Sequence, residues 1–181
     1  MPIASTDIIF RYSIASGTAG NSLATAGPGS SRGRYVSTSV LPSGGMNNLF
    51  PDITGDENAA GNVDYQCVFV LNNHATLTLK SAKVWIASEV AGGATTALAV
   101  DNIAPSVLAT GTVQAAEIAT KDTAPTGVSA FSTATTKAAG VSIGDLGPGQ
   151  VRAVWVQRTA TNSPATANDG VTIRVEGDSA A

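Results

Sequence analysis

Apolar and polar residues alternate most clearly between residues 63 and 86, VDYQCVFVLNNHATLTLKSAKVWI. In the first half every second residue is apolar, the period of a β-strand with one buried face: Val63, Tyr65, Cys67, Phe69 and Leu71. Val68 and Val70 make the other face apolar too, so this strand should end centrally in a sheet or beneath another layer. Asn72 and Asn73 tolerate positive φ and predict a turn into an antiparallel strand.

The returning strand changes phase. Leu77 and Leu79 share one face, whereas Ala82, Val84 and Ile86 have the opposite parity. A β-bulge, or a strand that bends and crosses to a second sheet, produces such a slip, and both are common in sandwiches.

The C-terminal part of the chain predicts two more strands, over residues 151–158 and 171–176, after turns at 146–149 and 168–170. Residues 7–14 and 95–100 predict weaker strands. Residues 101–143 favour short strands with long excursions, although 112–118 is also compatible with a helical turn or two. We therefore expect an all-β protein, an antiparallel β-sandwich of Ig-like or jelly-roll-like type with an extended N-terminal arm.

The arm is predicted from residues 14–34, which are rich in Gly and Ser and show no periodicity. We divide the chain into an arm over residues 1–34 and one sandwich domain over residues 35–181. The arm is expected to lie along a neighbouring subunit, and the alternative is that it folds back on its own sandwich. In the first case, deleting residues 1–34 leaves the sandwich folded but abolishes attachment to the neighbour.

Residues 36–62 contain one apolar cluster and an acidic segment. Leu49 and Phe50 are expected to close one end of the core. The carboxylates of Asp52, Asp56, Glu57 and Asp64 allow a calcium interpretation, but their spacing fits no EF-hand, so a solvated acidic loop is favoured.

Composition excludes several functional classes. Only 13% of the residues are charged and the net charge is −3, so no basic surface for nucleic acid is expected. No apolar run has the length of a membrane helix and the start lacks the pattern of a secretory signal, so we expect a soluble protein made in the cytoplasm. Neutral small side chains cost little to desolvate, which suits contacts with other subunits.

Few residues offer chemistry. Cys67 lies on the inward parity of its strand and is expected to be a small buried hydrophobe. His74 is the single histidine, in a turn, where we expect it to be exposed. Trp85 could stack on a sugar, although packing in the core or at an interface is more common. We expect no enzyme, no cofactor and no metal.

Three segments carry a resemblance: FPDITGDENAAGNVDYQCVFVLNNHATLTLKSAKVWI, TAPTGVSAFS and LGPGQVRAVWVQRT with NDGVTIRVEGD. Their pattern resembles small β-sandwich structural proteins of tailed bacteriophages. The resemblance implies a virion component, a head decoration or cement protein that bridges capsid subunits, with tail, neck, baseplate or fibre structural and receptor-binding modules as the alternative. Implied partners are the major capsid protein or other virion proteins, in a homo-oligomer, without nucleic acid or membrane. The expected interface residues are Arg11, Arg32, Arg34, Leu49, Phe50 and Trp85.

Overall fold

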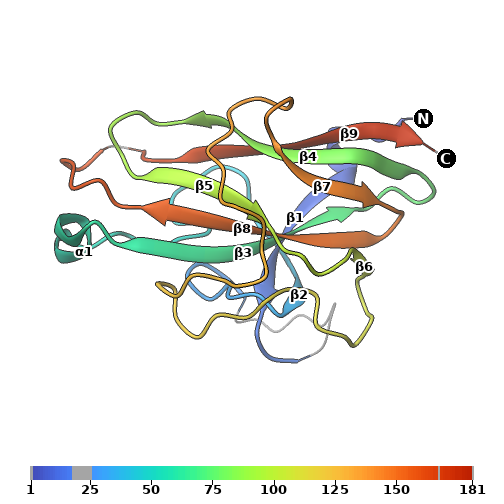
Figure 1. Cartoon of the computed structure of the whole chain (residues 1–181), viewed down its shortest axis with the longest axis horizontal. Helices are drawn as coiled ribbons and strands as arrows, with labels where there is room; N and C mark the ends of the chain where they lie inside the picture. The colour runs from blue at the N-terminus through green and yellow to red at the C-terminus, as the bar shows by residue number, and fades with distance from the viewer. Residues whose placement is uncertain (1, 18–25, 167, 181) are drawn as a thin grey trace.

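Two antiparallel β-sheets pack face to face in the computed structural model, which describes residues 2–17, 26–166 and 168–180. The larger sheet has the order β2-β1-β3-β8-β5, with the short β6 also paired to β8. The smaller sheet has the order β7-β4-β9 and lies above the larger one in Figure 1. The predicted all-β antiparallel sandwich is thus confirmed.

The strands occupy most of the predicted positions, including the weakly patterned ones near residues 7–14 and 95–100. Their bounds, with those of a short 3-10 helix η1 and a helix α1, are η1 Ser5–Asp7, β1 Ile8–Ile14, β2 Tyr35–Val40, α1 Gly55–Ala60, β3 Val63–Asn72, β4 Thr78–Glu89, β5 Thr95–Val100, β6 Ser106–Val107, β7 Val141–Leu146, β8 Gln150–Thr159 and β9 Val171–Ala180.

The strands over residues 63–86 do not pair with each other. β3 pairs with β1 and β8, whereas β4 pairs with β7 and β9, so the segment between them is a corner that joins the two sheets. Asn72 holds this corner: its Nδ2 donates to the carbonyls of Leu77 and Leu146, both at 2.9 Å. Positive φ at Asn72 or Asn73, which the sequence suggested, is absent.

The phase slip in β4 is a β-bulge, as one of the two interpretations predicted. The register with β9 shifts between Lys80 and Lys83, where Ser81 has a φ of 50°. Gly177 of β9 lies against the bulge, and a Cβ there would stand 2.5 Å from the Lys80 carbonyl oxygen. The bulge therefore requires glycine at this position of β9.

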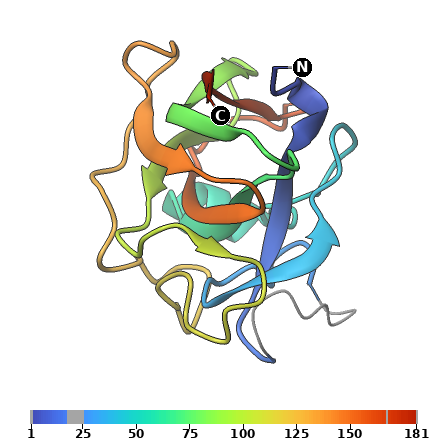
Figure 2. The same cartoon turned by 90° about the vertical axis from the view of Figure 1, so that its right-hand side faces the viewer.

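Both faces of the larger sheet are buried. The face toward the smaller sheet forms one core, which includes Val68, Val70 and Val154, and the opposite face forms a second core around Phe69 and Trp155. Among the described residues no third sheet covers this second face; the segment between β6 and β7 crosses it, which Figure 2 shows on the lower left. The expectation that β3 ends beneath another layer is confirmed.

Asp101 fastens this covering segment to the sheet. Its Oδ2 accepts hydrogen bonds from Trp155 Nε1 at 3.0 Å and from the Ala116 backbone at 2.8 Å. Residues 128–132 also run along β5, with two backbone hydrogen bonds of 2.9 Å between Leu98 and Ser132. Residues 112–118 form no helix, which agrees with the favoured interpretation.

The predicted division at residue 34 is wrong for the residues that the structure describes. β1 lies inside the larger sheet between β2 and β3, so part of the supposed arm is a strand of the sandwich. Ser31 is fully buried, and its Oγ donates to the Cys67 carbonyl at 2.6 Å. Residues 2–17 and 26–34 thus fold back on their own sandwich, and deleting residues 1–34 would remove a central strand. The predicted arm residues 18–25 lie outside the described residues.

The two ends of the described chain lie side by side (Figures 1 and 2). The backbone N–H of Ile3 donates to Ser179 Oγ at 3.0 Å. The beginning of the chain thus meets the last residues of β9.

Candidate functional site

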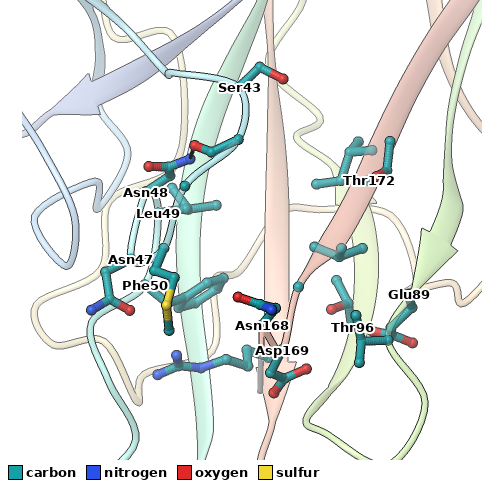
Figure 3. Close-up of a pocket in the computed structure, with 18 of the residues that line it drawn as sticks. Ser43, Asn47, Asn48, Leu49, Phe50, Glu89, Thr96, Asn168, Asp169 and Thr172 are labelled. Carbon is teal, nitrogen blue, oxygen red and sulfur yellow. Dashed lines mark hydrogen bonds between the residues drawn. The ribbon is translucent and has the colours of Figure 1, made fainter. Parts of the chain in front are cut away.

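A groove of about 610 Å³ opens between the loop that follows β2 and the start of β9. Figure 3 shows Leu49 and Phe50 on one wall and Thr172 and Asp169 on the other. The walls combine apolar side chains with serine, asparagine, threonine and carboxylate groups. Of its polar side chains, Asn48, Arg158 and Asp169 bond to backbone groups of the protein itself.

The loop over residues 41–50 forms one wall and is held in shape by its own backbone. Gly44, Gly45 and Asn47 all have positive φ, at 78°, 82° and 57°. Asn48 Nδ2 donates to the carbonyls of Pro42 and Gly44, and its own carbonyl accepts from the Tyr12 hydroxyl. The loop therefore presents a defined surface although it contains no regular secondary structure.

Leu49 and Phe50, on this wall, pack near Arg158 at the floor of the groove. Leu49 and Phe50 are half-buried and pack against the core between the sheets, so they close one end of this core as the sequence predicted. The Arg158 guanidinium lies 4.6 Å from the centre of the Phe50 ring, and its Nη1 donates to the Pro51 carbonyl at 2.7 Å. Its buried Nε has no hydrogen-bond partner among the described residues.

The rim carries exposed apolar side chains and a fixed carboxylate. Met46 is 66% exposed and Val90 is 36% exposed. Asp169 Oδ2 accepts from the Ala94 backbone at 2.9 Å, and Gly93 packs so closely against this carboxylate that a Cβ would stand 2.1 Å from Oδ1. Asp169 thus fixes the loop between β4 and β5, while Met46 and Val90 remain available for contact.

The strand that borders the groove, β9, is the last strand of the smaller sheet and, within the described residues, pairs only with β4. Its residues alternate as predicted: Val175 is buried and Val171 and Ile173 are half-buried, while the residues between them are exposed. An edge strand of ten residues leaves one row of backbone donors and acceptors without a partner strand. Groove and free edge together form the candidate interaction surface.

A buried ion cluster supports the groove from below. Asp64, whose side chain is 4% exposed, accepts from Lys121 Nζ and from Arg158 Nη2, each at 2.6 Å. Lys121 Nζ also donates to Glu57 at 2.8 Å. Arg158 thus connects the groove floor to a cluster that joins α1, β3, β8 and the covering segment.

Glu57 is held in this cluster by helix capping. Thr54 Oγ1 accepts from the Glu57 backbone at 3.2 Å, and Glu57 Oε2 accepts from the Thr54 backbone at 2.9 Å. The hydrogen bond from Lys121, with those from Thr54, lowers the pKa of Glu57 to about 2. The prediction of a solvated acidic loop is correct for the exposed Asp52 and Asp56, but it is wrong for the paired Glu57 and the buried Asp64.

The structure separates the predicted interface residues. Leu49 and Phe50 lie in the groove, but Trp85 is only 6% exposed and is wrong as a surface anchor or a sugar platform. The reason is that the segment before β7 covers it, with Gly140 packed against its Cβ. The burial of Trp85 could not be predicted from strand parity, because parity places Trp85 on the face of β4 that points away from the core.

Two of the three predicted arginines bond to their own chain, and the third is half-buried. Arg32 Nη1 donates to the Ala119 carbonyl at 2.7 Å, and Arg34 Nη1 donates to that of Ala15 at 2.8 Å. Arg34 also lies 5.1 Å from the centre of the Tyr35 ring. Arg11 is half-buried, and this burial lowers its pKa. None of the three lines the groove.

The other candidate reactive groups have structural roles. His74 is half-buried rather than exposed, and its Nδ1 accepts from the backbones of Thr76 and Leu77 at 3.2 and 3.0 Å. Cys67 is fully buried, as predicted, and burial raises the pKa of its thiol. Within residues 2–17, 26–166 and 168–180, no group of three or more His, Cys, Asp or Glu side chains is placed to hold a metal ion.

Comparisons with known proteins place the chain in no family. No family model matches it, and no curated protein or solved structure shows significant similarity. Among the helices of the described residues, none has the length and apolar character required to cross a membrane. The described residues form an all-β sandwich with a groove beside an open sheet edge.

Proposed function

We propose that this protein is a noncatalytic structural component of a tailed-bacteriophage virion, a head decoration protein that binds the capsid shell and stabilises it by bridging capsid subunits. The observation that carries the proposal is the groove between Leu49 and Thr172, which lies directly beside the free edge of β9. An extended segment of a shell protein can pair with a sheet edge through its backbone while its side chains enter an adjacent groove.

The surface chemistry supports a role in assembly. Only 13% of the residues are charged, which is about half the usual share of a soluble domain. Met46 and Val90 add exposed apolar area at the groove. A partner that covers such side chains removes apolar surface from water, which favours binding, and few charges have to be desolvated at the same time.

The structure changes the proposed mode of attachment. Because β1 belongs to its own sheet, residues 8–14 are committed to the sandwich. The groove and β9 replace the arm as the proposed contact with the capsid protein. The receptor- or glycan-binding alternative loses its aromatic platform, since Trp85 is buried.

The test compares attachment of two matched variants to phage particles assembled without the protein. Met46→Glu places a charge at the groove rim, whereas Val107→Glu places the same charge on β6, where Val107 is 51% exposed and lines no part of the groove. We expect the first variant to lose occupancy on the head and the second to keep it.

Cryo-electron microscopy of the same particles locates the protein. Copies spread over the head surface would support a decoration protein. A ring confined to the neck or tail, or no copies on the particle, would contradict the proposal, and so would full head occupancy by Met46→Glu.

A further inference from the structure

The free edge of β9 differs from the outer edge of the larger sheet, because in the described part of the chain no other segment runs along it. The outer strand β5 of the larger sheet is followed by residues 128–132, which bond to Leu98 and Val100. At β9, Ile3 reaches the edge region only at Ser179, through the hydroxyl. Residues 172–178 thus have backbone groups that another strand can complete.

The side chains of β9 determine which strand fits. Arg174, Glu176 and Asp178 are exposed and lie on the outward face, whereas Val171, Ile173 and Val175 face the core. Arg174 and Glu176 are two residues apart, so an antiparallel copy of the same strand can place each opposite the other. The contact that Glu176 makes within its own chain is weak: Lys137 Nζ lies 3.9 Å away, and both side chains are more than 40% exposed.

Two-fold symmetry restricts the possible registers. A two-fold axis perpendicular to the sheet keeps the core-facing residues of both copies on one side. Residues directly opposite each other must then have the same parity, so the axis lies midway between one residue and the same residue of the second copy. An axis at Arg174 or at Glu176 places that residue opposite the same residue of the second copy, so that like charges meet. An axis at Gly177 places Glu176 opposite Asp178, and one at Ile173 leaves the charges without opposite partners.

An axis at Val175 gives the register in which opposite charges lie opposite each other. Arg174 then lies opposite Glu176 of the second copy, and the pair occurs twice by symmetry. On the other face, Ile173 lies opposite Gly177, which packs against the β4 bulge and places no side chain beside it. The ladder spans residues 172–178 and ends before Ser179, where Ile3 lies.

We propose that β9 is a self-complementary edge through which two copies of this chain join antiparallel about a two-fold axis at Val175, so that two three-stranded sheets become one sheet of six strands. The partner is a second copy, and backbone hydrogen bonds supply most of the contact, with the Arg174–Glu176 pairs selecting the register. The dimer uses the same edge of β9 that the proposed function gives to a segment of the capsid protein, so on a given edge the two contacts are alternatives. The dimer is therefore tested in solution without phage particles, where its failure leaves the attachment test unaffected.

The experiment measures the mass of the full chain in solution by analytical ultracentrifugation over a range of concentrations, for the unchanged chain and four variants. E176R and R174E each place like charges opposite each other twice. We expect dimerisation to weaken about ten-fold or more in each, because two favourable pairs become two repulsive ones. The double variant R174E/E176R restores opposite charges and should restore the dimer.

The matched control is E89R, which makes the same change at an exposed position of β4, opposite Val171 and outside the proposed contact over residues 172–178. It should dimerise like the unchanged chain. Circular dichroism of all five proteins verifies that the sandwich is folded. A chain that is monomeric at every concentration would overturn the proposal. So would a dimer that ignores the single charge reversals, or one that the double variant fails to restore.

Discussion

Replacing Asp64 by asparagine should lower the free energy of unfolding more than removing a charge at the surface does. The Asp64 carboxylate is almost fully buried and accepts two charge-assisted hydrogen bonds, from Lys121 and Arg158, each 2.6 Å long. Asparagine is not a substitute for it, since an amide presents only one accepting oxygen and turns an N–H₂ group toward one of the two cations.

The expected magnitude follows from the geometry. A hydrogen bond to a charged group contributes about 1.5–3 kcal/mol, and removing one partner of a buried ion pair costs about 3–5 kcal/mol. Lys121 is 29% exposed and keeps its contact with Glu57, so its part of the loss is partly compensated by water. We expect Asp64→Asn to lower the free energy of unfolding by about 3 kcal/mol, or Tm by roughly 6–12 °C.

Urea unfolding followed by tryptophan fluorescence measures this difference, because Trp85 and Trp155 are both buried in the folded chain. The matched control is Glu117→Gln, since the Glu117 carboxylate is 46% exposed and lies 3.7 Å from Arg34. Such an exposed pair contributes less than about 1 kcal/mol. If both variants lose the same small amount, the ion cluster does not stabilise the fold as argued.

Two further predictions concern the same fold. Glu57 has a pKa of about 2 in the folded chain against an ordinary value of 4.5, so its contribution to stability is complete above pH 4.5 and is lost as the pH falls through about 2. The stability difference between the unchanged chain and Glu57→Gln, followed by urea unfolding from pH 6 to pH 2, should therefore shrink toward low pH, and a constant difference would contradict the assignment. Gly33→Ala should destabilise the chain by more than about 2 kcal/mol in thermal unfolding, because φ is 91° and the new Cβ would stand 1.8 Å from the Ala116 carbonyl oxygen. Gly27→Ala, with nothing within 4 Å of its Cβ, should be nearly neutral, and equal effects of the two substitutions would show that the close approach is not a constraint.

Strands were predictable where the alternation is local, and their partners were not. β9 shows its core-facing and exposed residues directly in the sequence, and alternation also marks β3 and β8 as strands, although both faces of their sheet are buried. The pairing of Val63 with Thr159 is not encoded in that pattern, and the corner after Asn72 resembles a hairpin turn because both need polar residues between two apolar runs. The local sequence pattern thus predicted where the strands lie, whereas the pairing of strands into two sheets depends on contacts between residues far apart in the sequence.

Part of the site was also open to prediction. Leu49 and Phe50 were identified because an isolated apolar cluster between polar loops has to pack somewhere. The helix α1 was missed although Thr54 and Glu57 have the spacing of a capping box. The fate of residues 26–34 could not be predicted, because Ser31 is held by Cys67 and Gln66, and neither contact leaves a periodic pattern in the sequence.

The contact between Ile3 and Ser179 has a practical consequence for anyone who produces this protein. An affinity tag or fluorescent fusion at either end starts beside the last residues of β9, where an extended linker can itself lie along the open strand. Such a fusion would compete with whatever binds there. Labels inserted in the exposed loop around Gly111, which belongs neither to β9 nor to the groove, leave the edge free for its natural occupant.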